Sequence, residues 1–164
     1  MPDDYGDLRQ LGRTRIGLIW QLAQAGVDLE DGDRRLAEVL RQHPEYHHVW
    51  EDVESLAGEI STLDGVNPFA HVLMHHVVEN QLADDDPPQT TRALEALLKV
   101  GTDRHDAVHA IAAVVAEELN DMVRVERVFD RDGYVDALED LARTARQCRR
   151  RGRRAGKGGR TGRR

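Results

Sequence analysis

Cysteine is almost absent from this sequence, since Cys148 is the only one in 164 residues. One thiol cannot form an internal disulfide, and it excludes a zinc site built from several cysteines. Aromatic residues are also rare, at 4% of the chain. A core with so few rings must be filled mainly by Leu, Val and Ala, as in a helical bundle.

Long apolar runs are missing too, and none approaches the roughly 18 residues of a membrane-spanning helix. The first residues, MPDDYGDLRQ, have neither the basic nor the apolar region of a secretory signal, so we expect a cytoplasmic protein. The chain also lacks G-x-S-x-G, H-E-x-x-H and a glycine-rich phosphate loop. The common signatures of esterases, zinc proteases and nucleotide-binding enzymes are therefore excluded, and whether the protein is an enzyme stays undecided.

Acidic and basic residues are unevenly distributed along the chain. The net charge is −7, yet ten of the arginines and Lys157 lie between Arg143 and the C-terminus, where there is no acid. The remainder therefore holds 12 basic and 30 acidic residues. The glycine-rich and arginine-rich end cannot bury enough apolar surface to offset its loss of entropy, which predicts disorder. We expect a bundle domain over residues 1–145 and a disordered basic tail over 146–164.

Apolar spacing predicts an all-α fold, a single bundle of about five to six helices. A helix near the N-terminus should end at Gly26, and Pro44 should end the second helix and begin the third. Asn67 is a suitable N-cap for the next helix. The predicted ranges are 1–30, 31–42, 44–55, 67–82, 89–100, 103–126 and 132–145, with a loop at 58–66.

Histidines recur four residues apart more often than chance predicts. Eight histidines placed at random would give about 0.4 such pairs, and this sequence has three. Side chains four apart on a helix are neighbours, and paired histidines are typical of metal-binding bundles such as the hemerythrin-like and DinB-like ones. The sequence therefore predicts that one transition metal ion, zinc or iron, binds in the core between His43, His47, His71, His75, His105 and His109.

Two of the pairs are followed by a glutamate at the same spacing. Glu51 comes four residues after His47, and Glu79 comes four residues after His75. Eight residues of helix span about 12 Å, so one ion cannot be bound by all three side chains of such a run. The two glutamates are therefore candidates either for a second ion or for hydrogen bonds that orient the histidines. His48 and His76 lie off the apolar stripe, and we expect them to face solvent.

Two other functions compete with metal binding. A histidine on an apolar face is commonly a hydrogen-bonded core residue, so the chain could be a structural or partner-binding helical protein without metal. The segment Arg146–Arg164 could instead bind nucleic acid or another polyanion through its phosphates, perhaps on the ribosome. The oligomeric state is not indicated by the sequence.

The histidine motifs resemble those of DUF1841, a family of uncharacterised bacterial proteins. The matching segments are HPEYH from His43, NPFAHVLMH from Asn67, Gln81 with Pro87, and H-x₃-H from His105. Here Asn80 and Val108 stand where the family commonly has glutamates, which removes two carboxylates from a carboxylate-rich di-iron site. The resemblance spans about residues 36–141 and implies no particular reaction.

Overall fold

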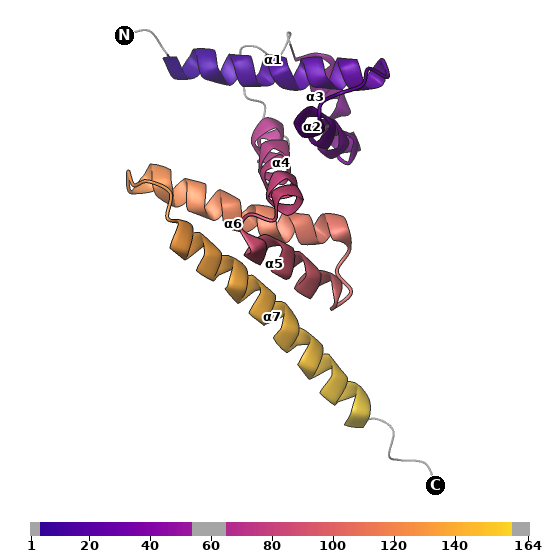
Figure 1. The fold of residues 1–164 in the computed structure, drawn as a ribbon, viewed down its shortest axis with the longest axis vertical. Coiled ribbons are helices and arrows are strands. Elements are labelled where there is room, and N and C mark those ends of the chain that lie inside the picture. Colours follow the sequence, from indigo (N-terminus) through magenta and orange to yellow (C-terminus); the bar gives the residue numbers. More distant parts are fainter. Residues whose placement is uncertain (1–3, 54–64, 159–164) are drawn as a thin grey trace. The chain divides into compact units, whose positions relative to one another are not determined.

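The computed structural model describes residues 4–53 and 65–158, and within these ranges the chain is helical and has no strand. The all-α helical bundle predicted from the sequence is confirmed. The residues group into two compact units, the first ending at His76 and the second beginning at Val77. The elements are α1 (Asp4–Gln24), α2 (Asp31–Arg41), the 3₁₀ turn η1 (Pro44–Tyr46), α3 (His47–Glu51), α4 (Pro68–Asp84), α5 (Pro88–Leu98), α6 (Arg104–Arg124) and α7 (Arg131–Gly158) (Figure 1).

The first unit is built on the buried faces of α1, α2 and α3. Helix α1 ends at Gln24, close to Gly26, whose φ of +71° is costly for residues with a side chain. Arg15 forms an ion pair with Asp33 at 2.7 Å, which joins α1 to α2. The core of this unit contains Ile16, Ile19, Trp20, Ala23, Leu36, Ala37, Val39, Leu40, Tyr46, Val49, Trp50 and Val72.

The helix predicted over residues 44–55 is wrong in its first turn. Pro44–Tyr46 form a 3₁₀ turn, and the α-helix that follows, α3, ends at Glu51. His43 has φ −119° and ψ 68°, outside the helical region, as expected for a residue before proline. A 3₁₀ turn has 3.0 residues per turn instead of 3.6, so side chains four apart across it do not share a face. Most of the predicted loop at 58–66 lies outside the described residues.

In the second unit, α5 packs against both α6 and α7 (Figure 1). Buried alanines, among them Ala93 and Ala107, allow these helices to approach closely. The side-chain oxygen of Gln81, on α4, accepts hydrogen bonds from the hydroxyls of Thr90 at 2.9 Å and Tyr134 at 2.8 Å. Gln81 therefore links α4 to α5 and α7. Burial raises the pKa of Tyr134, so its hydroxyl stays protonated and remains a donor.

The last helix is longer than the sequence pattern predicted. Helix α7 continues to Gly158, whereas apolar periodicity placed its end at Ala145. Arginine and alanine have high helix propensity, so a helix can extend beyond the last residue that packs on the core. The division of the chain into a bundle and a disordered tail stays a prediction, and residues 159–164 lie outside the described residues. Each described helix is too short or too polar to cross a membrane.

Glu118 fixes the connection between α6 and α7. Both of its carboxylate oxygens accept hydrogen bonds from the guanidinium of Arg127 at 2.6 Å, and one also accepts from the backbone N–H of Asp130 at 2.8 Å. The hydrogen bonds from Arg127 contribute most to lowering the pKa of Glu118 from 4.5 to about 2. The ionised carboxylate is therefore favoured by the folded chain.

We expect this carboxylate to make the stability of the second unit depend on pH. Because its pKa is lower in the folded state, its contribution is present above pH 4.5 and is lost as the pH falls toward 2. Glu118→Gln should flatten the dependence of the unfolding free energy on pH in that interval, as measured by denaturant titrations followed by circular dichroism. Glu139→Gln, at an exposed position on α7, is the control. Equal slopes for Glu118→Gln and the unmodified chain would contradict this role.

Candidate metal centre

Helix α4 presents two histidines from a capped N-terminus. The side-chain oxygen of Asn67 accepts hydrogen bonds from the backbone N–H groups of Phe69 at 3.0 Å and Ala70 at 3.3 Å, which confirms the predicted N-cap. His71 and His75 follow one turn apart, with ring centroids separated by 4.7 Å. His75 is 2% exposed, and His71 is half-buried. The helical spacing alone therefore brings these two imidazoles together on one face.

His43, at the end of α2, faces this pair with a defined tautomer. Its Nδ1 lies 2.7 Å from the carbonyl oxygen of Val39. A carbonyl can only accept, so Nδ1 carries the proton, and in the neutral ring Nε2 carries the lone pair. Histidines that bind metals commonly donate their second ring N–H to a carbonyl in this way. His43 is fully buried, and its Nε2 is the nitrogen that it offers to a ligand.

The three imidazoles of the first unit form a triangle. The ring centroid of His43 lies 4.8 Å from that of His71 and 4.7 Å from that of His75, and both ring pairs are nearly perpendicular. The Nε2 atoms of His43 and His71 are 3.0 Å apart, and one ring nitrogen of His75 lies within 4.8 Å of one of His43. These residues come from positions 28 and 32 apart, so they meet through the fold and not through local spacing.

Aromatic side chains surround this triangle, and the sequence pattern gave no role to them. The ring of Tyr46 lies parallel to His43 at 6.1 Å and edge-on to His71 at 5.8 Å. Trp50 contacts Tyr46 at 5.9 Å and Phe69 at 5.5 Å. Large buried rings have few rotamers open to them, so this packing restrains the imidazoles. The one signal in the sequence was that Tyr46 lies inside HPEYH.

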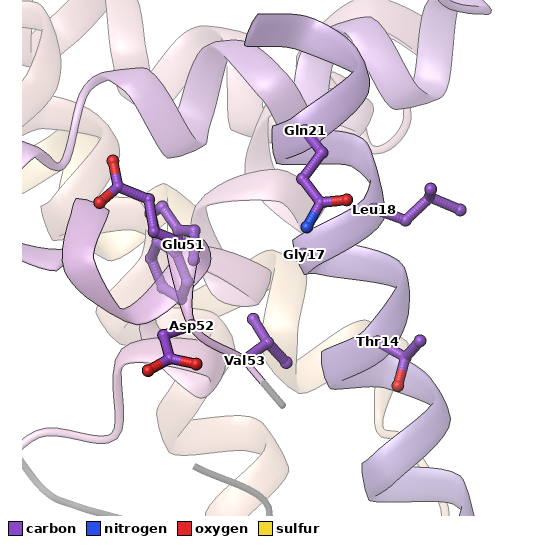
Figure 2. A pocket seen from close by; sticks show the side chains of 8 residues that line it. Thr14, Gly17, Leu18, Gln21, Glu51, Asp52 and Val53 are labelled. Atoms are coloured by element: carbon purple, nitrogen blue, oxygen red, sulfur yellow. The ribbon is translucent and has the colours of Figure 1, made fainter. Parts of the chain in front are cut away.

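Two residues predicted as ligands lie elsewhere in the first unit. The ring of His47 packs against Trp20 of α1 at 4.5 Å, and its buried Nε2 has no hydrogen-bond partner in the described part of the chain. Glu51 is exposed and lines a hollow of 310 Å³ between α1 and the end of α3. Figure 2 shows its carboxylate on the side of the hollow opposite Gln21. Among the described contacts, neither side chain touches the triangle.

The second unit contains the third histidine pair, at the start of α6. Asp103 caps this helix by accepting a hydrogen bond from the backbone N–H of His105 at 2.8 Å. The Nε2 atoms of His105 and His109 are 3.0 Å apart, and their ring centroids are 4.5 Å apart. Both side chains are half-buried. This pair meets as the i, i+4 spacing predicted.

Glu79 is engaged by a side chain that the spacing did not indicate. Its two carboxylate oxygens accept hydrogen bonds from the two terminal nitrogens of Arg104 at 2.7 and 2.8 Å. These hydrogen bonds are the main cause that raises the pKa of Arg104, so the guanidinium stays charged. The pair joins α4 to the first residue of α6. Nothing in the sequence connects positions 79 and 104, which are 25 residues apart.

The close nitrogen pairs suit a hydrogen bond as well as a shared ion. Two nitrogens bound to one tetrahedral zinc lie about 3.3 Å apart when the zinc–nitrogen bonds are about 2.0–2.1 Å. Without an ion, His71 must donate its Nε2–H to the Nε2 lone pair of His43. A metal would take both lone pairs once the proton on His71 moves from Nε2 to Nδ1. The residues present therefore fit a metal ion with little rearrangement.

Comparison with known proteins identifies one family. The family described as "Domain of unknown function (DUF1841)" has a model that matches residues 9–140, which is more than half of the chain. This match confirms the resemblance inferred from the histidine motifs. No curated protein and no solved structure matches the chain.

Proposed function

We propose, for a chain that belongs to the DUF1841 family of domains of unknown function, that its histidines bind a transition metal ion. The observation that carries this proposal is the triangle of His43, His71 and His75. Three buried or half-buried imidazoles in mutual contact would be a costly way to fill a core, because each ring has a polar nitrogen that needs a partner. A metal ion provides that partner for several nitrogens at once.

The chemistry of the donors supports zinc or iron as the bound metal. Neutral imidazole is a good ligand for zinc, iron, copper and nickel. His43 is already held in the tautomer that directs Nε2 outward from Val39. A metal held by three histidines keeps a fourth position for water or a small molecule, and a fourth protein ligand makes the site structural.

His105 and His109 remain proposed ligands for the same ion, as the sequence predicts. Their Nε2 atoms already lie 3.0 Å apart, so the pair can enter a coordination sphere without a change of rotamer. Glu79 is proposed to act by orienting neighbouring groups through Arg104, since both of its oxygens accept hydrogen bonds from that guanidinium. For Glu51 and His47, a ligand role stays a prediction.

Metal analysis of the full chain, purified without an affinity tag, tests the proposal. We expect about one equivalent of zinc or iron per chain, either as purified or after refolding with the metal. Removing the ion with a chelator should lower the melting temperature, because a ligand that binds only the folded state stabilises it by RT ln(1 + [L]/Kd). Less than about a tenth of an equivalent, with a melting temperature unchanged by chelator, would contradict the proposal. That result would favour a structural or partner-binding helical protein.

Binding of nucleic acid by Arg146–Arg164 stays a separate prediction, based on the charge of this segment. A cytoplasmic location is likewise a prediction. Measuring RNA affinity against salt concentration, with and without the residues after Ala145, tests the first of these.

A further inference from the structure

We infer that the histidine centre binds its metal through nitrogen alone, and that it therefore selects Zn²⁺ and similar transition metals over Mn²⁺, Mg²⁺ and Ca²⁺. This inference rests on the proposed function, and it concerns which metals the site accepts. The sequence left open a carboxylate-containing site, because Glu51 and Glu79 each follow a histidine by four residues. The structure gives both carboxylates other surroundings.

Glu79 is committed to an ion pair. Its side chain is only 16% exposed, and both oxygens are held by the guanidinium of Arg104. A charge-assisted pair of this bidentate geometry is strong, and a metal ion would have to displace Arg104 to reach the carboxylate. Arg104 would then lose its partner, which opposes the exchange.

Glu51 is turned toward solvent. It lines the hollow with Gly17 and Asp52, while the histidine four residues before it, His47, packs on Trp20 (Figure 2). The 3₁₀ turn at Pro44–Tyr46 is the physical cause, since it ends the α-helical register between His43 and the residues of α3. The run H-x₃-H-x₃-E is therefore not one continuous helical face here.

Histidine is the only residue type that the fold gathers at ligand distances. Within residues 4–53 and 65–158, no group of three or more metal-ligating side chains includes an Asp, a Glu or a Cys. The triangle of His43, His71 and His75 has aromatic neighbours, Tyr46 among them. Mg²⁺, Ca²⁺ and Mn²⁺ prefer carboxylate, carbonyl and water oxygens, whereas imidazole suits the later metals. A nitrogen-only site therefore discriminates between these two classes.

Competition with a chromophoric chelator, using the untagged full chain, tests the inference with Zn²⁺ and Mn²⁺ as probes. We expect Zn²⁺ to bind with a stoichiometry of about one and more than about a hundredfold tighter than Mn²⁺, in line with the order of divalent metal affinities at nitrogen sites. Glu79→Gln and Glu51→Gln keep the side-chain shape and remove the charge. Both should leave the Zn²⁺ affinity within about twofold of the unmodified chain, since neither carboxylate is a ligand.

Three results would overturn the inference while leaving metal binding intact. These are a Mn²⁺ affinity within about tenfold of that for Zn²⁺, a second equivalent of tightly bound metal, or a loss of more than about tenfold in Zn²⁺ affinity in either glutamine variant. Circular dichroism of both variants shows whether a loss comes from misfolding, and Mn²⁺ competition on the unmodified chain needs no variant at all. Absence of Zn²⁺ binding by the unmodified chain would instead contradict the proposed function itself.

Discussion

Replacing His75 with alanine is expected to lower the affinity of the chain for Zn²⁺ by more than about a hundredfold, beyond the usual effect of removing a group that only orients a ligand. His75 is almost fully buried, and its ring lies 4.7 Å from both His43 and His71. Its loss removes a ligand from the centre of the triangle, and no neighbouring donor can take its place without moving a helix. Stability gained from metal should be lost together with affinity, because the binding free energy is partly folding free energy.

The matched control is His48→Ala, on α3, whose side chain is exposed. Zn²⁺ affinity measured by competition, and the rise in melting temperature on adding Zn²⁺, should be unchanged in this variant. His109→Ala tests the proposed participation of the second unit, and a hundredfold loss there would support one shared ion. Zn²⁺ binding by His75→Ala that equals that of the unmodified chain would show that the triangle is not the site.

Replacing Trp50 with alanine should destabilise the chain by about 3–5 kcal/mol, the range for a large buried aromatic residue. Trp50 is fully buried and contacts both Tyr46 and Phe69, so its removal leaves a cavity beside the histidine triangle. Denaturant unfolding in the presence of a chelator separates this effect from any change in metal binding.

Phenylalanine at the same position should cost much less. The indole N–H of Trp50 has no acceptor in the described part of the chain, so Trp50→Phe removes a buried donor that has no partner while it keeps a ring in place. Leu11→Ala, at an exposed position in α1, is the control and should change the unfolding free energy by less than about 0.5 kcal/mol. A loss for Trp50→Ala as small as that for Leu11→Ala would mean that this core is not formed in solution.

Local sequence patterns predicted the helices and two of the three histidine pairs. The i, i+4 spacing of His71 with His75 and of His105 with His109 produced contacts in the structure, because both pairs lie inside uninterrupted α-helices. The cap at Asn67 was also predicted correctly, since an N-cap depends on a few consecutive residues. These features follow from backbone geometry that repeats every 3.6 residues.

The pair of His43 and His47 shows where that reasoning fails. Pro44 was recognised as a break between two helices, but the 3₁₀ turn that follows it changes the direction of every later side chain by an amount that spacing does not give. His43 consequently meets His71 and His75, and His47 meets Trp20. The end of α7 was misplaced for a different reason, because apolar periodicity marks only the part of a helix that packs against other residues.

The sequence by itself determined the helical class, most helix starts, and which histidines can pair within one helix, because each depends on residues close together in the chain. Only the tertiary structure decided the partners that come from distant positions. These are Val39 and His71 around His43, Arg104 for Glu79, and the hydroxyls of Thr90 and Tyr134 for Gln81. Such contacts depend on how whole helices are packed, and no period in the sequence encodes the rotation and offset of one helix against another.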